Sequence, residues 1–252
     1  GGFELGEQAR AAGMRAVVLK CHHGCTCGRA FLLNRMFPDF RVFGSIVLND
    51  TVGGFNCRAV ESALRMGATQ IWMPTKSAAN HQKHLGGRGG FTIFNGAKLR
   101  DDVRTILRQV AEADAILATG HLSPEESRVL IEEARAAGVK RISVTHPEWG
   151  VTAIPVGVQR SLAASGAVFF ERCLVSIHPG SKASVSFDTI VEQIRAVGVD
   201  STIAATDYGM PHFATPAEGL RDYANRLLGS GFSLAEVRRM VRDNPARLLR
   251  LN

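Results

Sequence analysis

Histidine and aspartate residues end three of the short apolar runs in this sequence, and they have the chemistry of metal ligands. His121, His146 and Asp207 each stand at the end of such a run. A polar residue there leaves the apolar layer, so packing alone does not account for it. Neutral imidazole and carboxylate are the ligands that zinc-like hydrolytic ions take. Together the three predict one divalent metal site, although each histidine taken singly could be an ordinary core or loop residue.

Lys20 ends the first apolar run and precedes His22 and His23. Because alternate side chains of an extended segment face opposite sides, we expect Lys20 and His22 to point into the site and His23 to point away. His22 would then be a further metal ligand. Lys20 could bind an anionic substrate, and a salt bridge at the strand end is the simpler alternative.

Glu171 follows two phenylalanines, and we expect it to end the apolar run that begins at Val168. A carboxylate in such apolar surroundings needs a partner, because burying an unpaired charge is costly. Glu171 could pair with Lys20 or bind substrate.

The stretch from Cys21 to Cys27 suggests a different site. It holds three cysteines and two histidines in seven residues. Structural zinc motifs usually pair two such clusters, and the remaining cysteines, Cys57 and Cys173, are isolated. A histidine of this stretch at the main metal site and unliganded thiols in a loop are the plainer interpretations.

The elements that must position these residues repeat along the chain. Each apolar run is followed by a loop and an amphipathic helix, and glycines end several helices directly before the next run. Nearly continuous apolar runs are typical of parallel strands covered on both faces. The runs are 15–20, 42–49, 70–74, 115–121, 141–146, 168–172 and 202–207. The pattern predicts an α/β fold, a TIM (β/α)8-type barrel that forms a single domain over 1–252.

An eight-stranded barrel needs one strand more. The chain opens with the predicted helix 4–12, so the first strand would precede Gly1. We expect that Gly1 is not the natural start. The longest interruption of the repeat lies between Pro74 and Ala115 and contains His81. This segment is either a loop over the barrel mouth, with His81 contacting substrate, or a disordered surface excursion.

In their order along the chain, these motifs resemble the amidohydrolase superfamily, and in particular an uncharacterised branch of metal-dependent hydrolase-like barrels. The resemblance covers nearly the whole chain. It rests on VLKCHH (18–23), VLND (47–50), IWMPT (71–75), ATGHLS (118–123), VTHP (144–147), ATD (205–207) and NPARLL (244–249).

The resemblance implies a metal-dependent hydrolase that cleaves an amide, lactone or other ester bond. His121 and His146 would be ligands of zinc, or of manganese or iron. Asp207 would bind the metal and act as the general base toward the attacking water. This role agrees with general chemistry, because a divalent ion lowers the pKa of bound water towards about 7 and a nearby carboxylate can accept its proton.

The chain departs from the superfamily pattern in two places. The His-x-His pair of the opening strand is missing, and Pro74-Thr75 stands where many members have a carboxylated bridging lysine. We therefore expect an altered metal arrangement, in which Lys20 could be the bridging group. Without the opening strand, we expect this chain to bind metal weakly or not at all.

Composition limits the partners. The 252 residues carry a net charge of +7, and basic and acidic residues alternate at helical spacings. We expect a small-molecule substrate and no nucleic acid. The positive net charge would suit an anionic substrate. No apolar run is long enough for a membrane span, no signal peptide is visible, and five cysteines are an odd number. These features favour a cytoplasmic protein, and a homo-oligomer is compatible with them.

Two alternative functions remain open. A phosphoesterase of the histidinol-phosphatase type also lines a barrel with histidines, and the basic charge would suit its substrates. A degenerate barrel that binds a ligand without catalysis is the other alternative, and the missing His-x-His pair supports it.

Overall fold

Each of the seven predicted apolar runs forms a strand. The computed structural model describes residues 1–164, 166–181, 183–210 and 212–251. The strands that correspond to the predicted runs are β1 (Ala16–Val18), β2 (Arg41–Val47), β3 (Ala68–Trp72), β6 (Ile116–Ala118), β7 (Arg141–Thr145), β8 (Val168–Cys173) and β9 (Thr202–Ala205). β8 continues past Glu171, so this residue lies within its strand and not at its end.

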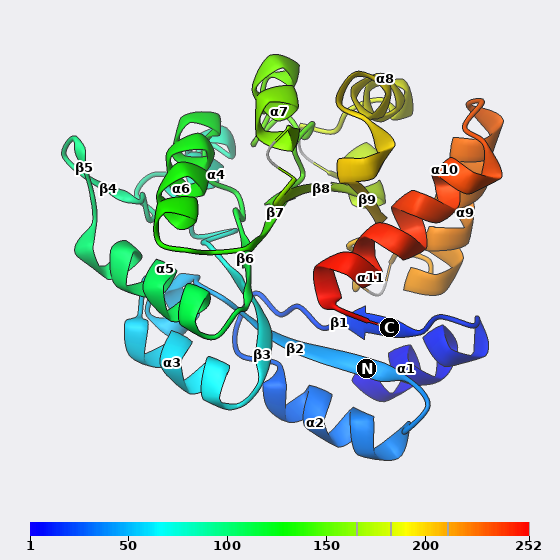
Figure 1. The fold of residues 1–252 in the computed structure, drawn as a ribbon, viewed down its shortest axis with the longest axis horizontal. Coiled ribbons are helices and arrows are strands. Elements are labelled where there is room, and N and C mark those ends of the chain that lie inside the picture. The colour runs from blue at the N-terminus through cyan, green and yellow to red at the C-terminus, as the bar shows by residue number, and fades with distance from the viewer. Residues whose placement is uncertain (165, 182, 211, 252) are drawn as a thin grey trace. The chain divides into compact units, whose positions relative to one another are not determined.

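Helices alternate with these strands, as Figure 1 shows. They are α1 (Gly2–Ala11), α2 (Cys27–Met36), α3 (Cys57–Arg65), α4 (Ala79–His84), α5 (Asp101–Glu112), α6 (Pro124–Ala136), α7 (Val156–Ala163), α8 (Phe187–Val197), α9 (Pro216–Gly229), α10 (Leu234–Arg238) and α11 (Asn244–Leu249). α6 begins with a capping box, in which Ser123 and Glu126 satisfy each other's backbone N–H groups. None of the helices in the described residues has the length and apolar character that crossing a membrane requires.

The chain forms two units, Gly1–Ile142 and Ser143–Asn252. The single barrel domain over 1–252 stays a prediction. In the first unit the strands pair in the order β1-β2-β3-β6, and all three pairings are parallel. In the second unit β8 and β9 are parallel, with Cys173 opposite Ala205.

Register brings the carboxyl ends of the first unit's strands to one edge. Val47, Trp72 and Ala118 lie level with one another on β2, β3 and β6. They form a buried apolar cluster, against which Val18 packs from β1. Residues that directly follow these strands must therefore lie close together.

The long segment between β3 and β6 contains secondary structure, which argues against the alternative of a disordered excursion. It contains α4 and an antiparallel hairpin of β4 (Phe94–Asn95) and β5 (Lys98–Leu99). Hydrogen bonds between Phe91 and the residues Ser77 and Ala79 tie the hairpin segment to the start of α4. This arrangement fixes His81 on a helix.

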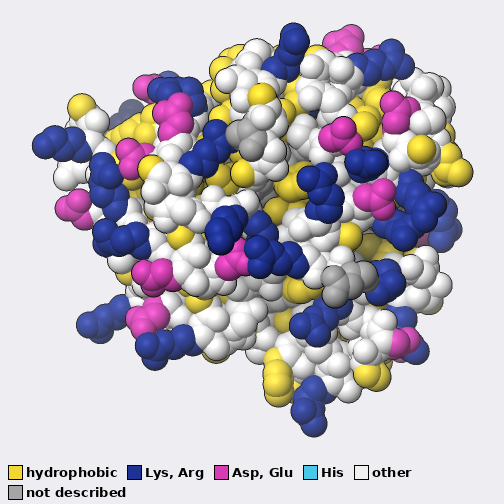
Figure 2. Space-filling model, viewed as in Figure 1, with side chains coloured by type: hydrophobic (Ala, Val, Ile, Leu, Met, Phe, Trp, Pro, Cys, Tyr) yellow, Lys and Arg dark blue, Asp and Glu magenta, His cyan; other side chains and the backbone are white. Residues whose placement is uncertain are grey.

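Basic side chains are spread over the face in Figure 2, and acidic side chains lie among them. Several pair as exposed ion pairs, such as Arg104 with Glu133 and Arg128 with Glu132. This is the distribution of an ordinary solvated surface, and the absence of a nucleic-acid partner stays a prediction.

Candidate active site

His146 and Asp207, two of the predicted metal ligands, lie side by side in the second unit. His146 directly follows β7, and Asp207 is the second residue after β9. The Nε2 atom of His146 lies 3.5 Å from the Oδ2 atom of Asp207. The imidazole is buried, whereas 28% of the Asp207 side chain is exposed. The pair combines a fixed ring with a carboxylate that solvent reaches.

Both residues have a left-handed backbone conformation. Their φ angles are 47° at His146 and 51° at Asp207. This conformation costs an L-residue about 1–2 kcal/mol, although aspartate tolerates it better than most. Such residues persist only where the surrounding structure holds them, and they concentrate at functional sites. A sharp turn after each of two strands thus brings these two side chains together.

The backbone of His146 is held on both sides. Its N–H donates to the carbonyl oxygen of Glu171 at 3.0 Å, which ties it to β8. Its carbonyl oxygen accepts from the N–H of Trp149 at 3.1 Å and from the hydroxyl of Thr152. The Trp149 ring meets the imidazole edge to face at 5.6 Å. These contacts fix the direction in which the imidazole points.

Glu171 lies next to this pair on β8. Its Oε2 atom is 3.4 Å from the hydroxyl of Ser143 on β7, which donates to it. Its carboxylate is thus close to the strand that carries His146. The expected pairing of Glu171 with Lys20 joins residues of the two units and stays a prediction.

Sequence analysis missed a buried ion pair beside His146. Arg172 on β8 is completely buried and donates to Glu148 at 2.9 Å and to Gln159 at 2.8 Å. Burial raises the pKa of Glu148, and the charges of Arg172 and His146 oppose that rise. An arginine inside an apolar run was the signal, because its charge requires a buried partner. Glu148 stands only two residues after His146, so the ion pair anchors the segment that follows this candidate ligand.

The first unit carries a second group of predicted residues, which begins with His22. The Nδ1 atom of His22 lies 2.8 Å from the hydroxyl of Thr75, after β3. Asn49, after β2, donates to the His22 carbonyl at 3.0 Å and to the Thr75 hydroxyl at 2.9 Å. His22 is half-buried and His23 is exposed, but both lie in a turn, so the parity of an extended segment does not apply and their directions stay a prediction. Asn49 was visible at a strand end, but sequence analysis gave it no role.

His81 and His121 face each other in the same unit. Their Nδ1 atoms lie 2.8 Å apart, and their rings stack with centroids 4.8 Å apart. Both are buried. In such a hydrogen bond between neutral imidazoles, the donor ring carries its lone pair on Nε2, which is the atom that a metal takes. The contact therefore suits a metal-binding histidine with a second histidine as its orienting partner.

Gly120 explains how His121 reaches this position. Its φ is 60°, and a Cβ atom there would overlap the carbonyl oxygens of Met73 and Pro74. The N–H of His121 donates to the Pro74 carbonyl at 3.0 Å. Only glycine allows this close approach of the chain after β6 to the end of β3.

Lys20 lies over an aromatic ring of the sheet. Its Nζ atom is 5.8 Å from the centroid of the Trp72 ring. A cation over the face of tryptophan is attracted by the ring's quadrupole. This contact draws the ammonium group to β3, and the predicted direction of Lys20 into the site stays a prediction.

The structure thus brings together His146 with Asp207, and His81 with His121. A shared ion for His121, His146, Asp207 and His22 stays a prediction. Within the described ranges, no cluster of three or more His, Cys, Asp or Glu side chains is spaced to hold a metal ion.

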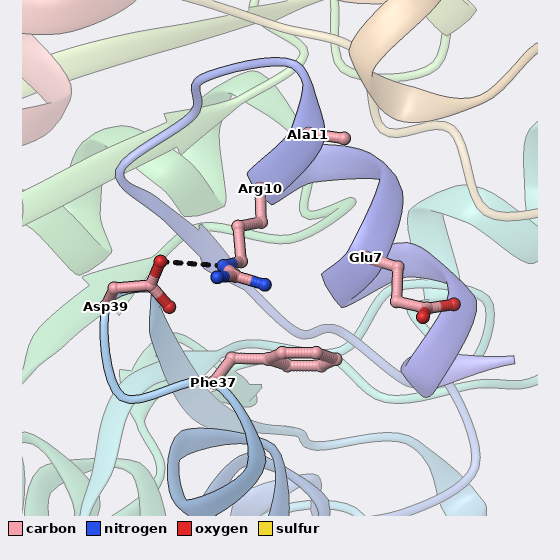
Figure 3. Close-up of a pocket in the computed structure, with 5 residues that line it drawn as sticks. All are labelled: Glu7, Arg10, Ala11, Phe37 and Asp39. Carbon is pink, nitrogen blue, oxygen red and sulfur yellow. Dashed lines mark hydrogen bonds and ion pairs between the residues drawn. The ribbon is translucent and has the colours of Figure 1, made fainter.

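A hollow of about 530 Å³ lies elsewhere, between α1 and the loop after α2. Figure 3 shows its lining residues, with Arg10 bonded to Asp39 at 2.7 Å beside Phe37. None of the predicted site residues lines it. The hollow is therefore not the predicted site.

Comparison with solved structures shows the fold. An amidohydrolase from Pseudomonas aeruginosa superposes with a TM-score of 0.71 at 14% identity, over 98% of this chain and 91% of that chain. A variant of the organophosphorus hydrolase from Deinococcus radiodurans gives 0.66 at 15% identity, over 98% and 82%. A metallopeptidase from Rhodobacter sphaeroides, liganded with a phosphinate mimic of the dipeptide L-Ala-D-Ala, gives 0.61 at 13% identity, over 98% and 72%. The predicted fold, an amidohydrolase-like α/β barrel of the TIM type, is confirmed.

Sequence comparison identifies the family. A search of curated proteins returned no match. One family model matches residues 2–170, about two thirds of the chain, and is described as a family of unknown function, DUF6282. The chain therefore belongs to this family of unknown function, and its fold is that of the amidohydrolase-like barrels.

Proposed function

We propose that this protein is a metal-dependent hydrolase, with Asp207 as general base and His146 as a metal ligand. The observation that carries the proposal is the approach of His146 to Asp207 in the second unit, 3.5 Å between Nε2 and Oδ2. This distance is long for a strong hydrogen bond. It fits two ligands of one tetrahedral ion, because two bonds of about 2.0–2.1 Å at the tetrahedral angle place the ligand atoms roughly 3.4 Å apart.

The conformations of the two residues support the same proposal. Each strand could end on an unstrained residue, and yet His146 and Asp207 both adopt positive φ angles. The two turns bring one imidazole nitrogen and one carboxylate oxygen within 3.5 Å of each other, which supports a shared role as ligands. Strain that serves packing alone would not require this chemical pairing.

The residues of the site would divide the chemistry. A divalent ion, with zinc favoured over manganese or iron, would supply Lewis acidity and an activated water. The partly exposed carboxylate of Asp207 would accept the proton of that water and pass it to the leaving group. The ring of His146 is buried against Trp149, and its backbone N–H is bonded to the Glu171 carbonyl, so its nitrogen would stay in place.

The first unit would add to the ligands and bind the substrate. His121 is the proposed further ligand, with His81 as its neighbour and a substrate contact, and His22 is a candidate beside Thr75. Lys20, over Trp72, is placed to attract an anionic substrate group. Glu171 is the proposed substrate contact of the second unit.

We propose a small-molecule substrate with an amide, lactone or other ester bond. Solved structures with this fold include an amidohydrolase and, from Deinococcus radiodurans, a lactonase. Phosphoester hydrolysis is the second candidate, favoured by Lys20 and by the fold's occurrence in an organophosphorus hydrolase. A cytoplasmic location and a homo-oligomeric state stay predictions.

A substrate panel with added metals tests the proposal. The protein would be freed of metal, then supplied with zinc, manganese or iron(II), and assayed on lactones, carboxylic esters, amides and phosphate monoesters. Metal-dependent cleavage of a lactone, ester or amide is expected. Cleavage of phosphate esters alone would contradict the first proposal and favour a phosphoesterase. No cleavage, together with no metal binding by calorimetry, would contradict both and favour the degenerate barrel.

A further inference from the structure

Thr26 fixes the segment between Cys25 and Cys27 onto the sheet. Its N–H donates to the Ser45 carbonyl at 2.9 Å, and its hydroxyl donates to the Leu19 carbonyl at 2.8 Å. The N–H of Ser45 in turn donates to the Thr26 hydroxyl at 2.8 Å. Thr26 is 1% exposed. The two cysteines therefore flank an anchored residue and not a loose loop.

Cys27 begins α2 and packs closely on β2. A Cβ atom at Gly44 would lie 2.7 Å from the Cα atom of Cys27 and 2.9 Å from its Sγ atom, so only glycine permits this approach. Cys27 is consequently buried, with 3% of its surface exposed, whereas Cys25 is half-buried. One sulfur of the pair is shielded and the other is reachable.

The sulfur of Cys25 lies in surroundings that stabilise negative charge. The N–H of Cys27, in the first turn of the ten-residue α2, donates to it at 3.5 Å. The partial positive charge of a helix N-terminus favours a thiolate there. The Cys27 side chain has the largest effect on this sulfur, and the charge of Arg29 adds to it. The Cys27 thiol also donates to the Ala63 carbonyl at 3.7 Å, which holds it in place. Against the effect of burial, these groups lower the pKa of Cys25 to about 6, while the same contact raises the pKa of Cys27.

We propose that Cys25 and Cys27 form a dithiol site that reacts with small-molecule disulfides, with Cys25 as the attacking sulfur. The site is independent of the proposed hydrolase chemistry. Nothing in that mechanism uses either sulfur.

The reaction proceeds in two exchange steps. The Cys25 thiolate attacks one sulfur of a disulfide RS–SR, which forms the mixed disulfide Cys25–S–SR and releases RS⁻. The Cys27 thiol then loses its proton and attacks the Cys25 sulfur, which closes the Cys25–Cys27 disulfide and releases the second RS group as a thiol. The protein loses two electrons and RS–SR gains them. A small dithiol reverses the reaction.

An aromatic disulfide that releases a coloured thiolate, 5,5′-dithiobis(2-nitrobenzoic acid), is the probe. A fast phase is expected that releases about two thiolates per chain, since the second exchange expels the probe. Its rate should rise with a midpoint near pH 6, the pKa of Cys25. At about pH 5.5 a larger fraction of Cys25 is thiolate than of a thiol of pKa 9, although a thiolate of lower pKa is a weaker nucleophile. The two effects together should make Cys25 react on the order of 30-fold faster.

Three variants separate the roles of the sulfurs. Cys27→Ser should release about one thiolate and keep the probe on Cys25, as peptide mass spectrometry would detect. Cys27→Ala removes the side chain that lowers the pKa of Cys25 most, so the midpoint should move upward. Cys25→Ser should lose the fast phase. Cys57→Ser is the matched control, because burial and, to a lesser extent, the charge of Asp102 raise the pKa of Cys57. The fast phase should persist in this variant.

Several outcomes would overturn the proposal. They are a fast phase that persists in Cys25→Ser, a wild-type midpoint above pH 8, or probe that stays bound to wild-type Cys25 with one thiolate released. If a variant does not fold, two measurements on the wild type still test the proposal: the pH midpoint of the fast phase and the position of the disulfide, mapped by peptide mass spectrometry. A fast phase mapped to Cys21 would likewise reject Cys25 as the attacking sulfur.

Discussion

The Nε2 atom of His146 lies 3.5 Å from the Oδ2 atom of Asp207, and both residues have left-handed backbone conformations at the ends of different strands. The two features together distinguish this pair from a surface ion pair such as Asp222 with Arg226, which lies within one regular helix. We infer that the strained backbone conformations are retained because they position these two side chains next to each other. This argument leads to a direct prediction about stability.

Asp207→Gly should be more stable than Asp207→Ala. Glycine adopts positive φ without the steric cost that alanine meets, so the difference should be about 1 kcal/mol. Both variants remove the carboxylate, so the comparison isolates the backbone term. Urea unfolding measures it. Equal stability of the two variants would mean that the conformation at Asp207 carries no strain.

Glu148→Ala should destabilise the protein severely. It leaves the charge of Arg172 buried without its ion-pair partner, which typically costs about 3–5 kcal/mol. The double variant Glu148→Leu with Arg172→Met removes both charges and should recover a large part of the loss. Asp222→Ala, in an exposed ion pair, is the control and should change the unfolding free energy by less than about 1 kcal/mol. A small effect of Glu148→Ala would contradict the anchoring of the His146 segment.

Gly120→Ala should destabilise the first unit and displace His121. The conformation alone costs an alanine about 1–2 kcal/mol, and the new Cβ atom would overlap the carbonyl oxygens of Met73 and Pro74. Gly28→Ala is the matched control, because its Cβ atom would meet nothing within 4 Å on α2. That change should stabilise by up to about 1 kcal/mol. Unfolding curves that coincide for the two variants would refute this explanation of Gly120.

The stability of the protein should depend on Cys25 between about pH 6 and pH 9. The folded-state pKa of Cys25 is lowered from 9.0 to about 6, so its thiolate stabilises the folded state above the unfolded pKa. That contribution is lost as the pH falls through 6. Above pH 9 the raised pKa of Cys27 acts in the opposite direction. Unfolding free energies of wild type and Cys25→Ser, compared across this range, should diverge as the pH rises from 6, and parallel curves would contradict the assignment.

Much of the fold follows from local sequence signals. Continuous apolar runs bounded by glycine define parallel strands, and the Ser123 capping box marks the start of α6. The strand ends then indicate which residues share an edge. Asp207 and His146 were identified in this way, since each leaves the apolar layer at a strand end.

The remaining contacts depend on long-range packing. His81 reaches His121 across 40 positions, because a helix forms inside a segment that has weak apolar periodicity. The ion pair of Glu148 and Arg172 requires knowledge of which face of β8 is covered. The reactivity of Cys25 depends on the hydrogen bond from the first turn of α2, and that turn is anchored by Thr26. Spacing in the sequence does not determine any of these three.

Turnover by Asp207→Asn, measured against Asp222→Asn with the same metal and substrate, tests the central claim most directly. An amide keeps the shape of the side chain but cannot accept the proton of water. The account predicts that Asp207→Asn lowers the metal-dependent hydrolysis rate by about 10²–10⁴-fold, whereas Asp222→Asn leaves it unchanged. Wild-type turnover in Asp207→Asn, with the fold intact by circular dichroism, would contradict the assignment of Asp207 as the general base.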